Sequence, residues 1–182
     1  MEVKNFEIEG LKLIINNIFE DERGYFTESY HKERFSNKVH DVNFIQENKS
    51  KSLLKGTVRG LHAQKPPNSQ AKLVNVVKGS ILDVAVDIRK KSKTYGKWIG
   101  ITLKEDDHSY FFIPSGFLHG FITLEDNSVI SYKCSDYYKK NSEIGVIYND
   151  KDLQIDWHNN SDVIISSKDS ELGSFRDLNS PF

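Results

Sequence analysis

The chain is poor in cysteine, in net charge and in long apolar runs, and each shortage excludes a class of protein. Its single cysteine, Cys134, cannot form an internal disulfide or build a multi-cysteine metal site, and we expect it to pack in a reducing compartment. The 25 basic and 26 acidic side chains nearly cancel, so no overall basic field points to nucleic acid or an anionic membrane as a partner. Any anion site must therefore be local.

Apolar stretches are short throughout the 182 residues. None reaches the length of a membrane span, and residues 1–10 alternate charged with apolar side chains, unlike the continuous apolar segment of a signal peptide. We therefore expect a cytoplasmic protein with no membrane partner. The length fits one domain, residues 1–182, with a substantial core, and no repeat or linker interrupts the sequence.

Strand signals dominate the chain. Short segments rich in β-branched and aromatic residues alternate with polar or glycine breaks, which predicts an all-β sandwich or barrel. Strands are expected at 11–19, 42–46, 58–62, 73–77, 81–88, 98–103, 110–113, 119–124 and 129–134, with hairpin turns at 78–80 and 126–127. Only two short helices are indicated, at 31–37 and 150–153, which argues against a parallel sheet covered by helices.

Charged residues interrupt the apolar faces of two of these strands. Asp83 and Asp87 share one face with Ile81 and Ala85, and Lys72 lies on a similar face of the preceding strand. Such charges either face solvent or line a polar cavity inside a barrel, and the pattern is compatible with both.

An arginine and a histidine lie three residues apart in the segment 57–64. Strand alternation places Arg59 and His62 on opposite faces, although a twist or bulge at Gly60 would bring both toward one pocket. A lone histidine beside apolar residues is more often a hydrogen-bonded core residue than a catalyst. This segment alone therefore does not define a site.

A second segment, 113–121, combines a tight turn with a histidine. Its P-x-G-x-x-H spacing, ending at His119, resembles the second conserved motif of cupins, which are jelly-roll barrels of two antiparallel sheets. Metal-binding cupins carry two histidines and a glutamate in their first motif, whereas here the matching region offers His62, Ala63 and Gln64. Since a first-row metal site normally needs three or more protein ligands, we expect no metal. The expected fold is a cupin-like jelly-roll barrel with a few short helices.

Six short segments, spread over nearly the whole chain, form a larger pattern. They are Asp-Glu-Arg-Gly at 21–24, Ile-Gln-Glu-Asn at 45–48, Arg-Gly-Leu-His at 59–62, and the segments 83–89, 113–120 and 132–133. Their number, order and spacing resemble the dTDP-4-dehydrorhamnose 3,5-epimerase (RmlC) family of nucleotide-sugar epimerases. The resemblance implies an isomerase that removes and returns a proton at C3 and C5, beside the 4-ketone of a nucleoside-diphosphate sugar. It implies no cofactor, and a role in making precursors of surface polysaccharides.

The resemblance assigns four residues to this chemistry. His62 corresponds to the base, and Asp169 to the carboxylate that orients its imidazole and stabilises the imidazolium. Lys72 corresponds to the cation beside the developing enolate oxygen, and Tyr132 to the proton donor on the opposite face of the sugar. Taken alone, Tyr132 would be a core aromatic, Lys72 a solvated strand residue and Asp169 a polar loop residue. Asp83 has no role in the resemblance, and we expect it to pair with Lys72 or His119 inside the cavity.

Further positions correspond to the family's substrate contacts. Arg23, Arg59 and Lys168 are expected to face anionic groups, since a guanidinium fork suits a diphosphate. Tyr138 corresponds to the aromatic that stacks on the base, a contact that does not identify the base. The remaining contacts, to nucleoside or sugar, are Glu28, Gln46, Asn48, His119 and Glu143.

The resemblance also implies a homodimer in which an N-terminal segment joins the neighbouring barrel, so that Arg23 and Glu28 serve the partner's pocket. The loop at 65–70 differs from dTDP-sugar members, which leaves open dTDP or GDP as the nucleotide and a hexose or a heptose as the sugar. Epimerisation at one carbon only, a 3,4-ketoisomerase and a non-catalytic sugar-nucleotide binding barrel are the alternatives. The full set of His62, Asp169, Lys72 and Tyr132 favours 3,5-epimerisation.

Overall fold

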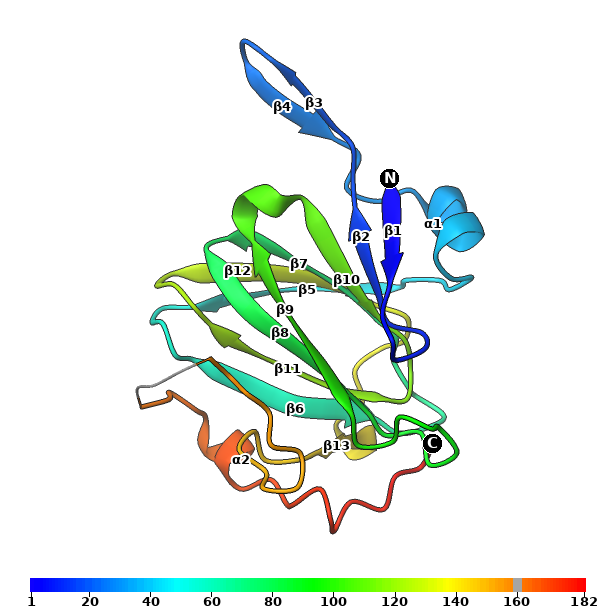
Figure 1. Cartoon of the computed structure of the whole chain (residues 1–182), viewed down its shortest axis with the longest axis vertical. Coiled ribbons are helices and arrows are strands. Elements are labelled where there is room, and N and C mark those ends of the chain that lie inside the picture. The colour runs from blue at the N-terminus through cyan, green and yellow to red at the C-terminus, as the bar shows by residue number, and fades with distance from the viewer. Residues whose placement is uncertain (159–161) are drawn as a thin grey trace.

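The computed structural model describes residues 1–158 and 162–182, and antiparallel strands are its main regular structure. A six-stranded sheet has the order β1 (Glu2–Asn5), β2 (Lys12–Ile15), β10 (Ser109–Ile113), β7 (Lys72–Lys78), β12 (Ser128–Cys134) and β5 (Gln46–Ser52). A five-stranded sheet has the order β13 (Glu143–Gly145), β6 (Val58–Gln64), β11 (Phe117–Thr123), β8 (Ser80–Asp87) and β9 (Trp98–Lys104). The two sheets face each other (Figure 1), which confirms the expected cupin-like barrel.

The other elements are short and lie around the barrel. They are the helices α1 (Lys32–Lys38) and α2 (Ser167–Ser170), the 3-10 turns η1 (Glu105–Asp107) and η2 (Lys140–Ser142), and the strands β3 (Ile18–Asp21) and β4 (Gly24–Thr27). Strands β3 and β4 pair only with each other and form a hairpin, here called the arm, that projects away from the barrel (Figure 1). Within the described residues, no helix is long and apolar enough to cross a membrane.

The strand expected at 11–19 is interrupted where the arm begins. The side-chain amide of Asn16 donates to the backbone carbonyls of Glu28 and Ser29, at 2.9 and 3.2 Å. This side chain thus fastens the two ends of the arm together where the chain leaves β2. The expected single strand is therefore two strands, β2 and β3.

Two other expectations are wrong for reasons of local chemistry and pairing. The strand placed at 42–46 in fact starts at Gln46 and runs through a polar stretch to Ser52, because pairing with β12 outweighs its low strand propensity. No helix forms at 150–153, because the Asp150 carboxylate accepts from the backbone N–H groups of Asp152 and Leu153, at 2.9 and 3.0 Å, and closes a turn. The helix at α1 is confirmed. The chain turns at 78–80 and 126–127 as expected, but neither turn closes a hairpin, because β7 and β12 belong to the six-stranded sheet whereas β8 and β11 belong to the five-stranded sheet.

Strand β8 is buried at all eight positions because both of its faces are covered. Ile81 and Ala85 point into the core between the sheets, whereas Leu82 and Val84 pack under the C-terminal segment that crosses the outside of the barrel. The carboxylates of Asp83 and Asp87 are 0% exposed. The alternative in which these charges face solvent is therefore wrong.

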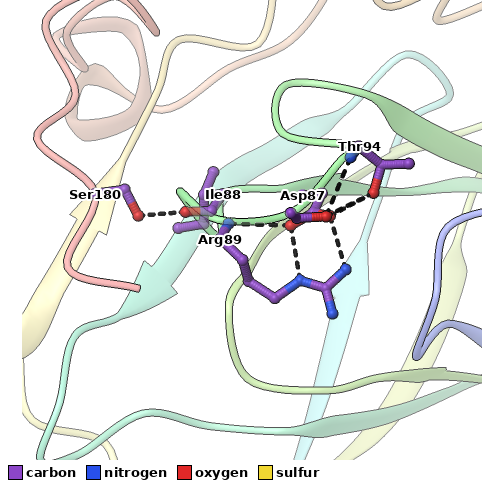
Figure 2. Close-up of polar contacts among 6 residues, drawn as sticks. Asp87, Ile88, Arg89, Thr94 and Ser180 are labelled. Carbon is purple, nitrogen blue, oxygen red and sulfur yellow. Dashed lines mark hydrogen bonds and ion pairs between the residues drawn. The ribbon is translucent and has the colours of Figure 1, made fainter.

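Asp87 anchors the corner where β8 ends, as Figure 2 shows. Its carboxylate accepts from Arg89 Nε at 2.8 Å, from Arg89 Nη2 at 2.7 Å and from the hydroxyls of Ser92 and Thr94 at 2.6 Å. Burial raises the pKa of this carboxyl group, but the hydrogen bonds together outweigh it and lower the pKa to about 2. The Ser180 hydroxyl donates to the Ile88 carbonyl and ties the C-terminal segment to the same corner (Figure 2).

Candidate active site

A polar cavity opens between the sheets, with two adjoining hollows. Three side chains, His62, Lys72 and Tyr132, line both hollows. His62 comes from β6 of the five-stranded sheet, whereas Lys72 and Tyr132 come from β7 and β12 of the six-stranded sheet. The three residues that the sequence assigned to base, cation and proton donor thus meet in one space, with His62 and Tyr132 contributed by opposing sheets.

A bulge in β6 brings Arg59 and His62 to the same cavity. His62 pairs with His119 and Arg59 pairs with Phe121, so β6 contains one more residue than β11 over this stretch. Gly60 lies at the bulge with φ +111°, and a Cβ there would sit 2.6 Å from the Cα of Gly120. Only glycine fits this close backbone approach. The bulge that the sequence allowed at Gly60 is therefore present, and it brings Arg59 and His62 toward one pocket.

His62 forms a partly buried pair with Asp169. The Nε2 atom of His62 lies 2.9 Å from Oδ1 of Asp169, and the other carboxylate oxygen accepts from the Gly60 N–H at 3.0 Å. Asp169 lies in α2, where its own N–H donates to the hydroxyl of Ser166, the N-cap residue, at 3.1 Å. Two fixed contacts therefore hold the carboxylate against one nitrogen of the imidazole.

The charge state of His62 follows from its surroundings. Burial lowers the pKa of His62 and outweighs Asp169 and Glu143, which raise it, while the positive charge of Lys72 lowers it further. The imidazole is therefore neutral near pH 7. Because the carboxylate of Asp169 can only accept, Nε2 carries the proton and Nδ1 carries the free lone pair.

Lys72 and Tyr132 have pKa values shifted in opposite directions by the same cause. Burial lowers the pKa of Lys72, against the negative charge of Asp83 and Glu143, and burial raises the pKa of Tyr132. The tyrosine hydroxyl therefore keeps its proton. The Nζ atom of Lys72 lies 3.4 Å from Nδ1 of His119.

Most of the expected substrate contacts lie around these residues. Gln46, Asn48, Tyr138 and Glu143 line one hollow, and Arg59, His119 and Lys168 line the other. Several are already fixed by neighbours: Tyr138 N–H donates to Gln46 Oε1 at 3.0 Å, Gln46 Nε2 donates to Asn48 Oδ1 at 3.1 Å, and Arg59 Nε donates to Ser52 Oγ at 3.3 Å.

Glu143 and Lys168 form an ion pair that joins the two hollows. Burial raises the pKa of the Glu143 carboxyl group, but the hydrogen bonds from Lys168 and Tyr138 lower it overall. The pKa of Lys168 is raised by the same bond. Lys168 is thus charged and stands beside the opening with its side chain 58% exposed.

Arg23 and Glu28 do not reach the cavity of their own chain. Arg23 lies at the tip of the arm with its side chain 83% exposed, and it pairs with Asp21 at 2.5 Å. Glu28, at the base of the arm, pairs with Arg34 at 2.7 Å. Within the described chain these two predicted contacts belong to a different surface from the other eleven site residues.

Some cavity residues were not predicted. Ser50, Gln64, Gln70 and Ser166 also line the hollows. Strand alternation from Asn48 points to Ser50, and the Ser166-x-x-Asp169 spacing is a helix N-cap signal. Alternation along β6 from His62 points likewise to Gln64, whereas Gln70 lies in the loop before β7 and carries no such signal. Within residues 1–158 and 162–182, no group of three or more His, Cys, Asp and Glu side chains is arranged to hold a metal ion.

Asp83 pairs with His119, one of its two expected partners. Its Oδ1 lies 2.7 Å from Nε2 of His119, and both residues are buried. Cys134 is buried as expected, beside Asn48, whose amide lies 3.8 Å from its sulfur.

Comparison with known proteins agrees with this arrangement. The family model described as dTDP-4-dehydrorhamnose 3,5-epimerase matches residues 5–177. The dTDP-4-dehydrorhamnose 3,5-epimerase of Escherichia coli (strain K12) is 40% identical over 179 residues, which are 98% of this chain and 96% of that protein.

Solved structures give the same result. A crystal structure of dTDP-4-dehydrorhamnose 3,5-epimerase from Elizabethkingia anophelis NUHP1 has a TM-score of 0.93 and 43% identity and covers 99% of both chains. The epimerase RmlC from Legionella pneumophila Philadelphia 1, in complex with dTDP-4-keto-L-rhamnose, has a TM-score of 0.93 and 40% identity, covering 98% of this chain and 94% of that one. The chain is therefore an isomerase of the dTDP-4-dehydrorhamnose 3,5-epimerase family, as its sequence motifs indicated.

Proposed function

We propose that the protein inverts C3 and C5 of a nucleoside-diphosphate 4-keto sugar, with His62 as base and Tyr132 as the opposing proton donor. The observation that carries this proposal is the His62–Asp169 contact of 2.9 Å in a cavity that Tyr132 lines from the opposite sheet. A base and an acid on opposite sides of a bound sugar are what inversion of a carbon requires.

The proposed step starts at Nδ1 of His62, the nitrogen that Asp169 leaves free. Nδ1 takes the proton from the carbon beside the ketone, and the electron pair of the C–H bond moves into an enolate. The ammonium group of Lys72 stabilises the negative charge on the enolate oxygen. The Tyr132 hydroxyl then returns a proton to the other face, and solvent restores the protonation of both residues.

The substrate proposed is a dTDP-linked 4-keto-6-deoxyhexose. Arg59 and Lys168 are positioned to bind the diphosphate, and Tyr138 to stack on the base. The names of the related proteins favour dTDP over GDP. Such a product would supply the synthesis of a surface polysaccharide.

We also propose that two copies exchange their arms. Phe26 of the arm is 68% exposed and Phe19 is 62% exposed, which is unusual for side chains of this size. Among the described residues, no strand pairs with the outer edge of β5, so this edge is open to a strand from a second copy. Exchange would bring Arg23 and Glu28 to the partner's cavity.

One labelling experiment tests the chemistry. The protein is incubated in deuterated water with dTDP-4-keto-6-deoxyglucose or with a GDP-linked 4-keto hexose, and NMR locates the deuterium. Label at both C3 and C5 of the dTDP sugar is the expected result. Label at one carbon would identify a single-site epimerase, a moved carbonyl would identify a ketoisomerase, and no label with either sugar would leave only a binding function.

A further inference from the structure

A second histidine–aspartate pair borders the cavity next to Lys72, with His119 lining the cavity and Asp83 buried behind it, and the proposed proton transfers do not use this pair. His119 is on β11 and Asp83 is on the neighbouring β8, both in the five-stranded sheet. Lys72 reaches them from β7 of the opposing sheet. The three side chains form one chain of contacts, with 2.7 Å from Asp83 Oδ1 to His119 Nε2 and 3.4 Å from His119 Nδ1 to Lys72 Nζ.

The geometry sets the direction of each hydrogen bond. A carboxylate only accepts, so Nε2 of His119 donates to Asp83, and Nδ1 of the neutral ring is left with a lone pair. An ammonium group only donates, so Lys72 donates to Nδ1. A protonated His119 would instead place its Nδ1–H against the cation. Both hydrogen bonds that link Lys72, His119 and Asp83 therefore form when Lys72 is positively charged, His119 is neutral and Asp83 is negatively charged.

The position of Asp83 is otherwise unfavourable for a carboxylate. It lies on β8 between Ile81 and Ala85, which both belong to the apolar core between the sheets. It is 0% exposed, and its second oxygen, Oδ2, has no hydrogen-bond partner among the described residues. A buried charge with one oxygen unsatisfied costs stability unless an opposite charge offsets it. The cation that it meets through His119 is Lys72.

We propose that Asp83 is a positioning residue that, through His119, aims Lys72 at the ketone oxygen and keeps it as an ammonium ion. This rests on the proposed function, in which Lys72 stabilises the enolate. Desolvation lowers the pKa of Lys72, and Asp83 is one of the groups that oppose this shift. The other titratable groups facing Lys72 are His62 on β6, His119 on β11, Tyr132 and Cys134 on β12 and Glu143 on β13.

The test compares Asp83→Asn with Asp87→Asn. Both residues are 0% exposed and lie on the same strand, but Asp87 binds Arg89 at the end of β8 (Figure 2), whereas Asp83 binds His119, which lines the cavity. Asparagine at 83 can still accept from His119, so the variant removes the charge and keeps the shape. A second variant, His119→Leu, removes both the donor to Asp83 and the acceptor from Lys72, and it replaces Asp83→Asn if that protein does not fold.

The first readout needs no substrate. Acetic anhydride is applied over a pH series, and the acetylation of Lys72 is measured by mass spectrometry. An amine reacts only when deprotonated, so the labelling curve of Lys72 is expected to move to lower pH in Asp83→Asn and His119→Leu and to stay in place in Asp87→Asn. Identical curves in all variants would overturn the proposal, and so would an equal movement in Asp87→Asn.

The second readout is turnover of the dTDP-linked substrate. Asp83→Asn is expected to lower kcat about 10- to 100-fold with little change in KM, less than the roughly 100- to 1,000-fold cost of deleting an oxyanion donor outright. The alkaline limb of its kcat profile moves to lower pH, which a merely structural loss would not cause. A shifted labelling curve in a protein that turns over no 4-keto sugar would refute the proposed function and leave the role of Asp83 toward Lys72 standing.

Discussion

Two histidine–aspartate pairs face the same cavity, and they differ in what the second nitrogen of each ring meets. His62 contacts Asp169 through Nε2, its side chain is 26% exposed, and its Nδ1 is free to accept a proton. His119 contacts Asp83 through Nε2 as well, but its Nδ1 faces Lys72 and its side chain is only 8% exposed. The same two residue types therefore suit a base in one place and a positioning device in the other.

A third pair shows that the combination alone means little. His158 and Asp156 lie 3.5 Å apart, both largely exposed, and neither lines the cavity. Water screens such a contact and leaves it with little effect on stability. Burial and the surrounding groups, more than the pairing itself, separate the three cases.

Removing the imidazole of His62 should have the largest effect on turnover. We expect His62→Ala to lower kcat by about 1,000-fold or more, within the range for a general base that also orients the reaction, and to abolish deuterium exchange at both carbons. The thermal midpoint should fall as well, because the Asp169 carboxylate, 6% exposed, loses its imidazole partner, so the rates are compared at a temperature where both proteins are folded. Near-normal exchange in this variant would mean that His119, and not His62, is the base.

The Asp169→Asn variant tests the His62–Asp169 pair through the pH dependence of the rate. The amide removes the charge that fixes the tautomer of His62, and we expect kcat/KM to fall by at least about 100-fold. Activity requires the neutral imidazole, so it is lost as the pH falls below the pKa of His62. Asp169 raises that pKa, and its removal should therefore move the acid limb of the profile to lower pH. The matched control, Asp156→Asn at the exposed pair, should leave both rate and profile unchanged.

The Tyr132→Phe variant tests which of the two histidine–aspartate pairs lies opposite the proton donor. Loss of the hydroxyl should lower the rate of completed inversion by about 10- to 100-fold, while deuterium exchange at the first carbon continues, because His62 still removes the proton. NMR of the product and of recovered substrate measures the two rates in one sample. If exchange and inversion fall equally, Tyr132 does not act on the face opposite His62.

The smallest effect on activity is expected for Asp87→Asn, which should mainly reduce stability. We expect a loss of about 2 to 4 kcal/mol in the free energy of unfolding, because Arg89 loses its carboxylate partner. The stabilisation is fully present above the ordinary pKa of 3.8 and is lost as the pH falls through about 2. Denaturation curves measured at pH 7 and at pH 2.5 should therefore show a smaller difference in the free energy of unfolding between variant and parent at pH 2.5 than at pH 7.

Sequence patterns predicted the strands that carry regular apolar alternation, and missed the elements that do not. β7, β8 and β12 lie within one residue of their expected ends, since β-branched residues alternate along them. β5 is polar throughout and becomes a strand only by pairing with β12. β1, β13 and α2 have three or four residues each, too few for any period to show.

By itself the sequence determined the residue types of the site and the family, because motifs such as Arg59 to His62 are local and keep their order along the chain. Only the tertiary structure decided which group meets each nitrogen of His62 and His119. That depends on Asp169 arriving from a C-terminal helix 107 residues away and on Lys72 reaching His119 from the opposing sheet. Such contacts depend on how the two sheets pack, which alternation within one strand cannot report.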